Sequence, residues 1–393
     1  MSSQAPLTIS LVIEGTFPWY RGGVSEWICH YLDYFRTAHF HIIQISTDDY
    51  AGYELTEGVY PVPENVKSFT RINPPEDLTD PKKWTDSILE LLPRQPANFI
   101  HVLNTGLAGL AGLALSKRDE IPLILTEHGV YWKEIELGAD ALECGYRIPS
   151  NPTERHLASL FFQSIAREVY KQSSLIFSVS VCNQVFQSEL GAQNSTYIPN
   201  GVPFRMVSTV PEFHPVFDDP VVGWVGRCAH LKNPHRFLDL AEKWSETEGW
   251  NPRFLMLLAD AGEADLNEEV RLRLSQIPTI TAIWNQPASS YFDKMDALCL
   301  TSISEAQPLV MLEAMARGVV PFGWEAGDFN ESFGISFPKE SGVQDVLAGI
   351  LPIISDSDRW LSEQIDCHNK IVRAHTWPVI FGQYEHLFQE FSN

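Results

Sequence analysis

The chain has 393 residues, more than one hydrophobic core usually accommodates, so we expect two domains and exclude a single small binding module. Hydrophobic residues make up 44% and charged residues 20%, a composition that favours packed cores over long disorder. The net charge of −22 argues against nucleic acid as a partner, because such a surface repels phosphate backbones.

Short β-rich apolar runs alternate with helical patterns along the whole chain, as in parallel sheets covered by helices. In the first half, the predicted strands cover residues 8–14, 40–45, 99–103, 123–126, 175–179 and 196–198. The predicted helices there cover residues 24–35, 81–92, 107–117, 153–172 and 182–190. A second series of strands covers residues 221–225, 254–258, 280–283, 297–300 and 319–322, with helices between them. The predicted fold class is therefore α/β, with two Rossmann-like domains.

Residues 203–220 contain four prolines and little periodicity, so they are predicted to form an interdomain linker. The predicted domains are then 1–202 and 221–375. Ligands are expected at the carboxyl ends of the parallel strands, in the cleft between the domains. The glycines of residues 106–112 are spaced G-x-x-G-x-x-G inside a helical pattern, which we interpret as tight helix packing rather than a dinucleotide fingerprint.

Residues 304–318 follow the strand 297–300 directly and begin a helix, because Pro308 is favoured in a first helical turn. Glu305 is then in the loop, and Glu313 lies about 7 to 8 Å along the helix axis from Pro308. The helix N-terminus between the two acids offers N–H groups and a positive dipole end, which suits a diphosphate. Taken alone, the segment is also typical of an ordinary capped amphipathic helix.

Two cations follow the first strand of the second domain. Arg227 and Lys232 lie on a glycine-containing loop, where Arg227 can bind phosphate oxygens in a fork and Lys232 adds a point charge. The alternative is salt bridging to neighbouring acids, since exposed ion pairs are common.

Three shorter segments also contain candidate binding residues. Gly22 and Gly23 stand between the first strand and a helix, where they either admit a phosphate or sugar or simply form a turn. His128 leaves a strand before a glycine and would project into the cleft, although a lone histidine is more often structural. Asn200 belongs to a turn that joins the first domain to the linker.

These five segments, in this order, resemble the GT-B glycosyltransferases of family four, which are retaining enzymes that use nucleotide-activated sugars. The resemblance covers nearly the whole chain. The segments EGTFPWYRGGVSEW, TEHGVYWKE, IPNGV, GWVGRCAHLKNP and TSISEAQPLVMLEA are most similar to the PelF-type exopolysaccharide glycosyltransferases. The fold that this implies is two Rossmann-like domains facing across a cleft, with a C-terminal helix, residues 376–393, crossing back to the first domain.

The resemblance also implies roles for individual residues. Arg227 and Lys232 would neutralise the donor diphosphate, Glu305 would contact the transferred sugar, and Glu313 would hold the ribose hydroxyls. His128 would lie beside the reacting sugar, which makes His128, Arg227, Lys232 and Glu305 the expected catalytic set. The other expected donor contacts are Gly22, Gly23, Ile283, Trp284, Leu309 and Val310, and the expected acceptor contacts are Tyr131, Trp132 and Asn200. The family usually has glycine at Pro308, and because proline has no N–H, the phosphate contacts there fall to Leu309 and Val310.

The implied function is transfer of a hexose from a nucleotide-diphosphate sugar, most plausibly a UDP-sugar, to a saccharide or polyol hydroxyl. No cofactor and no metal are expected, because the cations and the helix dipole can stabilise the leaving diphosphate. Two alternatives are a GT-B protein that binds nucleotide sugar without transferring it, and a nucleotide-sugar epimerase. Dependence on an acceptor separates a transferase from an epimerase.

Location is predicted from what the sequence lacks. The longest apolar stretch, residues 107–115, is too short to span a bilayer, and the N-terminus has no basic signal segment. The six cysteines are scattered without a C-x-x-C pair, which fits reduced thiols better than disulfides or a zinc site. We therefore expect a cytoplasmic protein without an integral membrane segment; the sequence carries no signal of oligomeric state.

Overall fold

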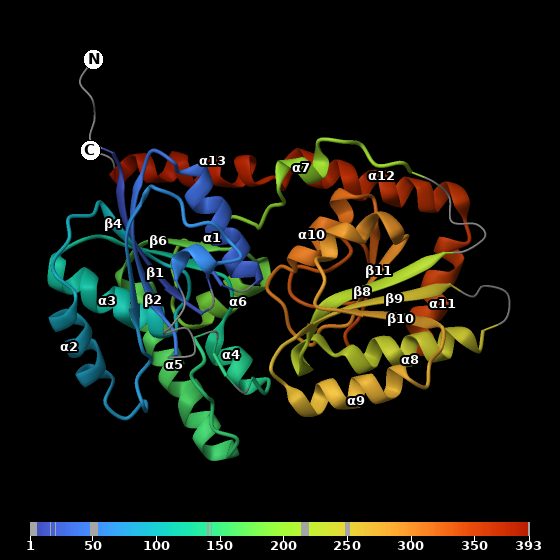
Figure 1. The fold of residues 1–393 in the computed structure, drawn as a ribbon, viewed down its shortest axis with the longest axis horizontal. Helices are drawn as coiled ribbons and strands as arrows, with labels where there is room; N and C mark the ends of the chain where they lie inside the picture. Colours follow the sequence, from blue (N-terminus) through green and yellow to red (C-terminus); the bar gives the residue numbers. More distant parts are fainter. Residues whose placement is uncertain are drawn as a thin grey trace. The chain divides into compact units, whose positions relative to one another are not determined.

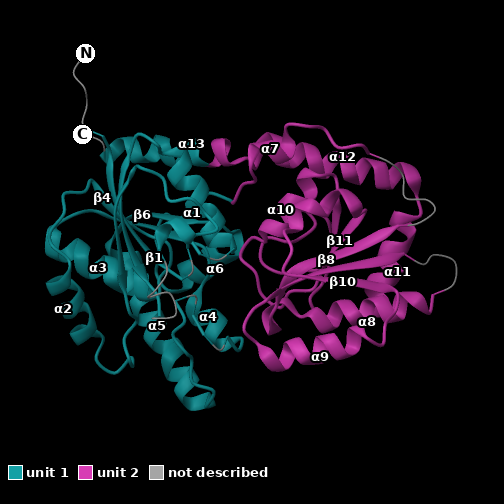
Figure 2. Ribbon diagram, in the orientation of Figure 1, with its two compact units in different colours: residues 1–199, 381–393 teal, residues 200–380 magenta. Residues whose placement is uncertain are grey.

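The computed structural model describes residues 6–15, 17–19, 21–47, 54–139, 141–142, 144–213, 220–247 and 252–391 (Figure 1). The chain forms two compact units, one of residues 1–199 and 381–393 and the other of residues 200–380 (Figure 2). The first unit is therefore discontinuous in sequence, since its last segment follows the whole of the second unit. No helix within the described ranges is both long enough and apolar enough to cross a membrane.

The sheet of unit 1 is parallel and has the strand order β3-β2-β1-β4-β5-β6-β7. Its central strand β1 is buried along almost its whole length, which explains its continuous apolar run. The strands are β1 (Thr8–Glu14), β2 (His39–Ile45), β3 (Val66–Ile72), β4 (Phe99–Val102), β5 (Leu123–Glu127), β6 (Ser173–Ser178) and β7 (Thr196–Tyr197).

Helices cover both faces of this sheet (Figure 1). Alternate residues of β4 show the two faces: Ile100 and Val102 pack in the core cluster with α2, α3 and α5, whereas His101 contacts aromatic rings of α1 and α13. The helices are α1 (Gly23–Tyr34), α2 (Pro81–Leu91), α3 (Leu107–Asp119), α4 (Tyr131–Glu136), α5 (Pro152–Gln172), α6 (Val181–Glu189) and α13 (Trp377–Phe388), with short 3-10 turns at η2 (Leu55–Glu57) and η6 (Gln389–Phe391).

The glycines of α3 serve close packing, as the sequence predicts. A Cβ on Gly112 would lie 2.2 Å from Cγ1 of Val102 on β4, and a Cβ on Gly109 would lie 2.8 Å from the Asn104 carbonyl oxygen. Both distances are far below van der Waals contact, so the helix can approach the sheet only because these side chains are absent.

Unit 2 repeats the same plan with the strand order β10-β9-β8-β11-β12-β13, again parallel. The helices α8, α9 and α11 lie on one side of the sheet, and α7, α10 and α12 lie on the other (Figure 1). The strands are β8 (Val221–Cys228), β9 (Arg253–Asp260), β10 (Ile280–Trp284), β11 (Ala297–Leu300), β12 (Val320–Trp324) and β13 (Ile335–Phe337). The helices are α7 (Phe204–Val207), α8 (Pro234–Ser245), α9 (Ala264–Leu274), α10 (Leu309–Ala316), α11 (Val343–Ile354) and α12 (Ser357–Ala374), with 3-10 turns at η3 (His230–Lys232), η4 (Ala288–Ser290) and η5 (Phe292–Lys294).

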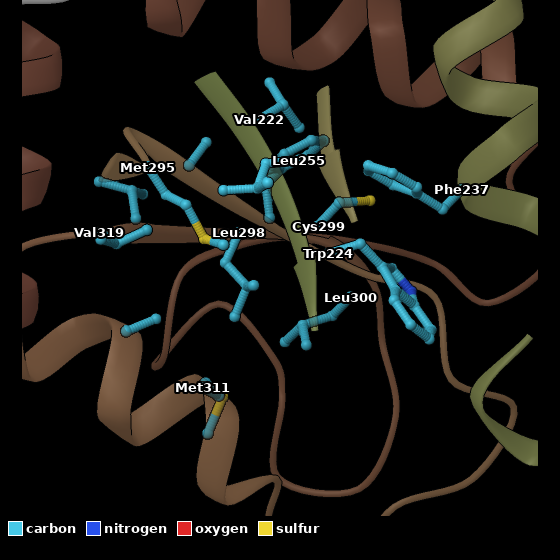
Figure 3. Close-up of a cluster of buried hydrophobic side chains, with 14 of the residues drawn as sticks. Val222, Trp224, Phe237, Leu255, Met295, Leu298, Cys299, Leu300, Met311 and Val319 are labelled. Atoms are coloured by element: carbon cyan, nitrogen blue, oxygen red, sulfur yellow. The ribbon is translucent and has the colours of Figure 1, made fainter. Parts of the chain in front are cut away.

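Apolar side chains from the central strands fill the core of unit 2 (Figure 3). Trp224 of β8 and Phe237 of α8 lie on one side, and Met295, Leu298 and Met311 lie towards α10. The five side chains are at most 6% exposed. Because burial of apolar surface stabilises the folded state by about 25 cal/mol per Å², this core holds β8 and β11 in place.

The structure differs from the sequence prediction at two edge strands, at the short helix α4 and at the linker. β3 and β13 escape prediction because β3 carries charged residues and β13 has only three residues. Within the predicted linker, Phe204–Val207 form α7, and Met206 and Val207 are buried in the core of unit 2. Residues 214–219 of the linker lie outside the described residues.

The two sheets share one topological feature that positions a site. In each, the order of strands reverses beside the first strand, between β1 and β4 in unit 1 and between β8 and β11 in unit 2. Loops leaving the carboxyl ends of such a pair diverge, and ligands of open α/β sheets bind at this switch point.

Candidate functional site

Two loops meet at the switch point of unit 2. The loop after β8 contains η3, and the loop after β11 runs from residue 301 to residue 308. The Ile303 N–H donates to the Leu231 carbonyl oxygen at 2.8 Å, and the Thr301 hydroxyl donates to the Lys232 carbonyl oxygen at 2.8 Å. Because Trp224 Nε1 donates to the same hydroxyl at 2.8 Å, the core itself fixes the relative position of the two loops.

Lys232 and Glu305 form an ion pair across this junction. Nζ of Lys232 donates to Oε1 of Glu305, and the Ser302 hydroxyl donates to the same oxygen at 2.7 Å. The side chains are 26% and 12% exposed, respectively, so a ligand can reach the pair while much of it is shielded from water. The alternative that the sequence left open, a salt bridge to a neighbouring acid, thus holds for Lys232, and that acid is itself a predicted site residue.

The other predicted donor-site residues of unit 2 lie at the same edge of the sheet. Arg227 is exposed near the end of β8, and Glu313 is partly exposed on α10. Pro308 takes the N-cap position of α10 and makes no side-chain cap. Because the first amides of a helix have no intrahelical acceptor, Leu309 and Val310 present N–H groups at this helix start.

Ile283 and Trp284 end the edge strand β10 and are partly buried. The guanidinium carbon of Arg271, on α9, lies 3.7 Å from the centre of the Trp284 ring. This cation–π contact stabilises the position of the Trp284 ring at the end of β10.

In unit 1, His128 follows β5 and packs edge-on against Trp27 of α1, with ring centres 5.0 Å apart. Its Nε2 is buried and has no hydrogen-bond partner among the described residues. Burial lowers the pKa of His128 to about 3, so the ring is neutral at physiological pH. The contact also connects His128 with the helix that Gly22 and Gly23 begin, because Gly22 is the N-cap of α1.

The predicted acceptor residues are more enclosed than the sequence suggests. Tyr131 and Trp132 begin α4 and are only 4% and 7% exposed, packed in the core of unit 1. The Tyr131 hydroxyl accepts a hydrogen bond from Asn104 Nδ2 at 3.2 Å. Both rings therefore have little surface to offer a ligand, and their acceptor role stays a prediction.

Asn200 belongs to unit 2, not to the first domain in which the sequence placed it. Its backbone N–H donates to Oε1 of Gln307 at 2.6 Å, and its Nδ2 donates to the Gln307 carbonyl oxygen at 3.3 Å. Asn200 thus contacts the loop that carries Glu305. Sequence reasoning missed Gln307, whose signal was only a polar residue before a helix-starting proline.

Two buried acids of unit 1 were also missed. Glu14 ends β1, accepts a hydrogen bond from the Ala108 N–H at 2.8 Å and has a pKa that burial raises to about 7. Glu127 ends β5 and accepts hydrogen bonds from Thr105, Tyr170 and Gln187 at 2.5 to 2.8 Å, while burial raises its pKa. Each acid stands at a strand end, and nothing in the local sequence indicates that its side chain is buried.

Comparisons with protein families divide the chain in two. Residues 211–334 match the family described as Glycosyl transferases group 1. Residues 7–88 and 82–195 match a domain of unknown function, DUF3492. A 2-deoxystreptamine N-acetyl-D-glucosaminyltransferase of Streptomyces fradiae is 27% identical over 172 residues, which is 42% of this chain and 39% of that protein. The match thus spans well under half of the relative's length.

Solved structures resemble the chain over almost its full length. Sucrose-phosphate synthase of Thermosynechococcus elongatus superposes with a TM-score of 0.75 at 14% identity, covering 98% of each chain. HepE of Anabaena, solved in complex with UDP-glucose, gives 0.69 at 15% identity over 97% of this chain and 99% of its own. The catalytic domain of starch synthase IV of Arabidopsis thaliana, bound to ADP and acarbose, gives 0.65 at 14% identity over 99% of both chains.

At these identities the structural likeness establishes the fold alone, and this fold is GT-B, as the sequence predicts. The part of the chain that matches the family model contains Arg227, Lys232, Glu305 and Glu313. Residues 211–334 therefore match the Glycosyl transferases group 1 family, within a chain whose fold is GT-B.

Proposed function

We propose that this chain is a retaining, metal-independent glycosyltransferase of family four that transfers a hexose from a UDP-sugar to a saccharide or polyol hydroxyl. The observation that carries the proposal is the Lys232–Glu305 pair at the switch point of a Glycosyl transferases group 1 domain. UDP-glucose in the HepE complex and the N-acetylglucosaminyl transfer named for the Streptomyces relative support a nucleotide-sugar donor.

The charges of unit 2 suit a leaving diphosphate. As the bond from the sugar carbon to the diphosphate oxygen breaks, negative charge grows on that oxygen. Arg227, Lys232 and the amides of Leu309 and Val310 lie at one edge of the sheet. They could stabilise this charge once the diphosphate has displaced Glu305 from Lys232. A divalent metal is then not required for this step.

The two acids of this site are assigned to recognition of hydroxyl groups. Glu305 would accept from hydroxyls of the transferred sugar, and Glu313 would accept from the ribose. We do not assign them as an acid and nucleophile pair, because that chemistry needs two carboxyl groups flanking the scissile bond. Retention would follow from attack by the acceptor on the face that the diphosphate leaves, with the departing phosphate taking the acceptor proton.

Unit 1 would supply the acceptor side. His128 is neutral and partly exposed after β5, which suits a contact with a sugar hydroxyl better than a contact with a charge. The similarity of the sequence to PelF-type enzymes supports a role in exopolysaccharide synthesis in the cytoplasm.

A binding measurement tests the donor assignment. Thermal shifts would be recorded with UDP, GDP, ADP and their common sugar conjugates, each with and without EDTA, since a ligand of the native state raises the melting temperature. We expect a chelator-insensitive shift with the uridine compounds. No shift with any nucleotide in a folded sample would refute the donor assignment.

Matched variants and product analysis complete the test. Lys232→Ala should abolish the UDP shift, whereas Lys243→Ala should preserve it, because Lys243 pairs with Glu246 on the exposed face of α8. Incubation with UDP-sugars and candidate acceptors then separates transfer from binding. Binding without acceptor-dependent loss of donor would refute the transferase.

A further inference from the structure

The structure assigns Gln307 as a positioning residue that couples the segments connecting the two units to the loop of Glu305. The inference rests on the proposed role of Glu305 in sugar recognition. Gln307 lies between Glu305 and α10, and only 5% of its surface is exposed.

The two connecting segments lie together inside unit 2. The chain enters unit 2 at Asn200 and leaves it after residue 380. Val202 pairs with Thr376 in a parallel bridge, in which the Val202 N–H donates to the His375 carbonyl oxygen at 2.8 Å and the Trp377 N–H donates to the Val202 carbonyl oxygen at 3.1 Å. Both ends of the unit therefore form one hydrogen-bonded element.

Asn200 joins this element to Gln307. The Asn200 carbonyl oxygen accepts a hydrogen bond from His375 Nδ1 at 3.1 Å, while its backbone N–H and its Nδ2 both donate to Gln307. All three residues are at least nine-tenths buried. In such an environment a polar group that loses its partner is left buried and unsatisfied, so these contacts resist a change of geometry.

The other end of Gln307 is fixed to a turn beyond β12. Its Nε2 donates to Oδ2 of Asp328 at 3.2 Å, and the Asp328 N–H donates to the Ala306 carbonyl oxygen at 2.8 Å. Gly327 has φ +60°, and a Cβ there would lie 2.3 Å from the Glu305 carbonyl oxygen. The backbone that follows Glu305 is thus held between the connecting segments and this turn.

Through these contacts Gln307 connects residues 200–202 with the loop that carries Glu305. A change of geometry at residues 200–202 would reach the backbone next to Glu305 through the two hydrogen bonds between Asn200 and Gln307, one to the Gln307 side chain and one from the Asn200 side chain. The donor-sugar loop therefore responds to the connecting segments, and Gln307 acts on catalysis through Glu305 rather than by touching substrate.

A reversal of hydrogen-bond polarity tests the coupling. Gln307→Glu keeps the acceptor for the Asn200 N–H but brings a carboxylate against Asp328. Adding Asp328→Asn supplies a donor again and keeps the net charge of the wild-type pair. Asp328→Asn alone is the control for effects of that turn.

The first measurement needs no ligand. Hydrogen exchange of the amides of residues 303–307, 309 and 310 should become at least about tenfold faster in Gln307→Glu and return towards wild type in the double variant, because loss of these contacts favours local opening. Unchanged exchange in Gln307→Glu would overturn the coupling whether or not the protein is a glycosyltransferase. Failure of the folded double variant to recover would do the same.

The second measurement concerns the donor. In Gln307→Glu we expect UDP affinity within about threefold of wild type but a loss of at least about tenfold in kcat and in the preference for UDP-sugar over UDP, since small displacements at a reacting centre are costly. Recovery of both in the double variant supports the assignment. Equal losses of UDP and UDP-sugar binding would overturn it, while absence of any nucleotide binding by the wild type would refute the proposed function.

Discussion

Lys232 Nζ and the Ser302 hydroxyl donate to one and the same oxygen of Glu305. The lysine that is proposed to meet the donor diphosphate is therefore neutralised by the acid that is proposed to meet the donor sugar. A nucleoside diphosphate must compete with Glu305 for this cation, and the release of Glu305 frees a carboxylate oxygen for a sugar hydroxyl.

Glu305→Gln should therefore bind UDP more tightly while transferring sugar poorly. Removing the carboxylate charge leaves Lys232 available to phosphate, so we expect UDP affinity to rise about three- to tenfold, in the range of a partly buried ion pair. Isothermal titration calorimetry measures the affinity and product formation measures the transfer. Glu246→Gln is the matched control, because it changes the net charge equally at the exposed Lys243 pair. Weaker UDP binding by Glu305→Gln would contradict this competition.

His128→Phe should separate stability from activity. The imidazole Nε2 is buried without a partner, so a phenyl ring in the same edge-on contact with Trp27 should preserve the melting temperature or raise it. Transfer should fall at least about tenfold if the imidazole binds a substrate hydroxyl, because an acceptor or donor of a hydrogen bond is then lost in the transition state. A lower melting temperature with unchanged kcat would instead identify a purely structural histidine.

Glu14 should make stability decline with pH. Burial raises the pKa of Glu14 from 4.5 to about 7, so the folded state holds this proton more tightly than the unfolded chain does. As pH rises from the unfolded pKa of 4.5 to the folded pKa of about 7, the free energy of unfolding falls by up to about 3 kcal/mol. Above the folded pKa this contribution no longer changes.

Glu14→Gln removes that titration. The difference in melting temperature between Glu14→Gln and wild type should therefore grow from about pH 5 to about pH 8, with the variant the more stable at the higher pH. Taking the difference cancels the opposite contribution of His101 and His128, whose lowered pKa values make stability rise with pH. A constant difference across this range would show that Glu14 does not titrate in it.

Two glycine substitutions should have contrasting effects. Gly112→Ala places a Cβ 2.2 Å from Val102 Cγ1, which should cost about 1 to 3 kcal/mol of stability through overpacking. Gly22→Ala should leave the melting temperature unchanged, because the backbone is extended at φ −172° and the nearest side-chain atom is 4.0 Å away. Differential scanning calorimetry compares the two. Destabilisation by Gly22→Ala would mean that this glycine serves the fold rather than a ligand.

The sequence predicts most of this architecture because its strands are buried on both faces. β1, β4 and β5 read as short apolar runs, and the glycines of α3 already indicate close helix packing. β3 is missed because its edge position allows Lys67 and Arg71 to interrupt the pattern. Edge strands bury too little surface to impose an apolar run.

The candidate site is predictable only in part, for a physical reason. Arg227 lies at the end of a strand, Lys232 and Glu305 lie in loops after strands, and Glu313 lies in the helix that follows one of those loops. The chain order of such segments places them at one sheet edge. The pairing of Lys232 with Glu305 and the contact of Asn200 with Gln307 join residues 73 and 107 positions apart. No local pattern encodes contacts of that range, because loop conformation decides them.

The C-terminal segment also governs how the protein can be made. Phe381, Tyr384 and Phe388 of α13 are at most 1% exposed and pack on rings of β4, α1 and β6 in unit 1. During translation, residues 1–199 emerge long before these rings do, so unit 1 must wait for the ribosome to finish unit 2 before its core can close. A nascent or truncated chain that ends before α13 leaves the aromatic rings of β4, α1 and β6 uncovered, and a division of the protein at residue 199 removes the same contacts.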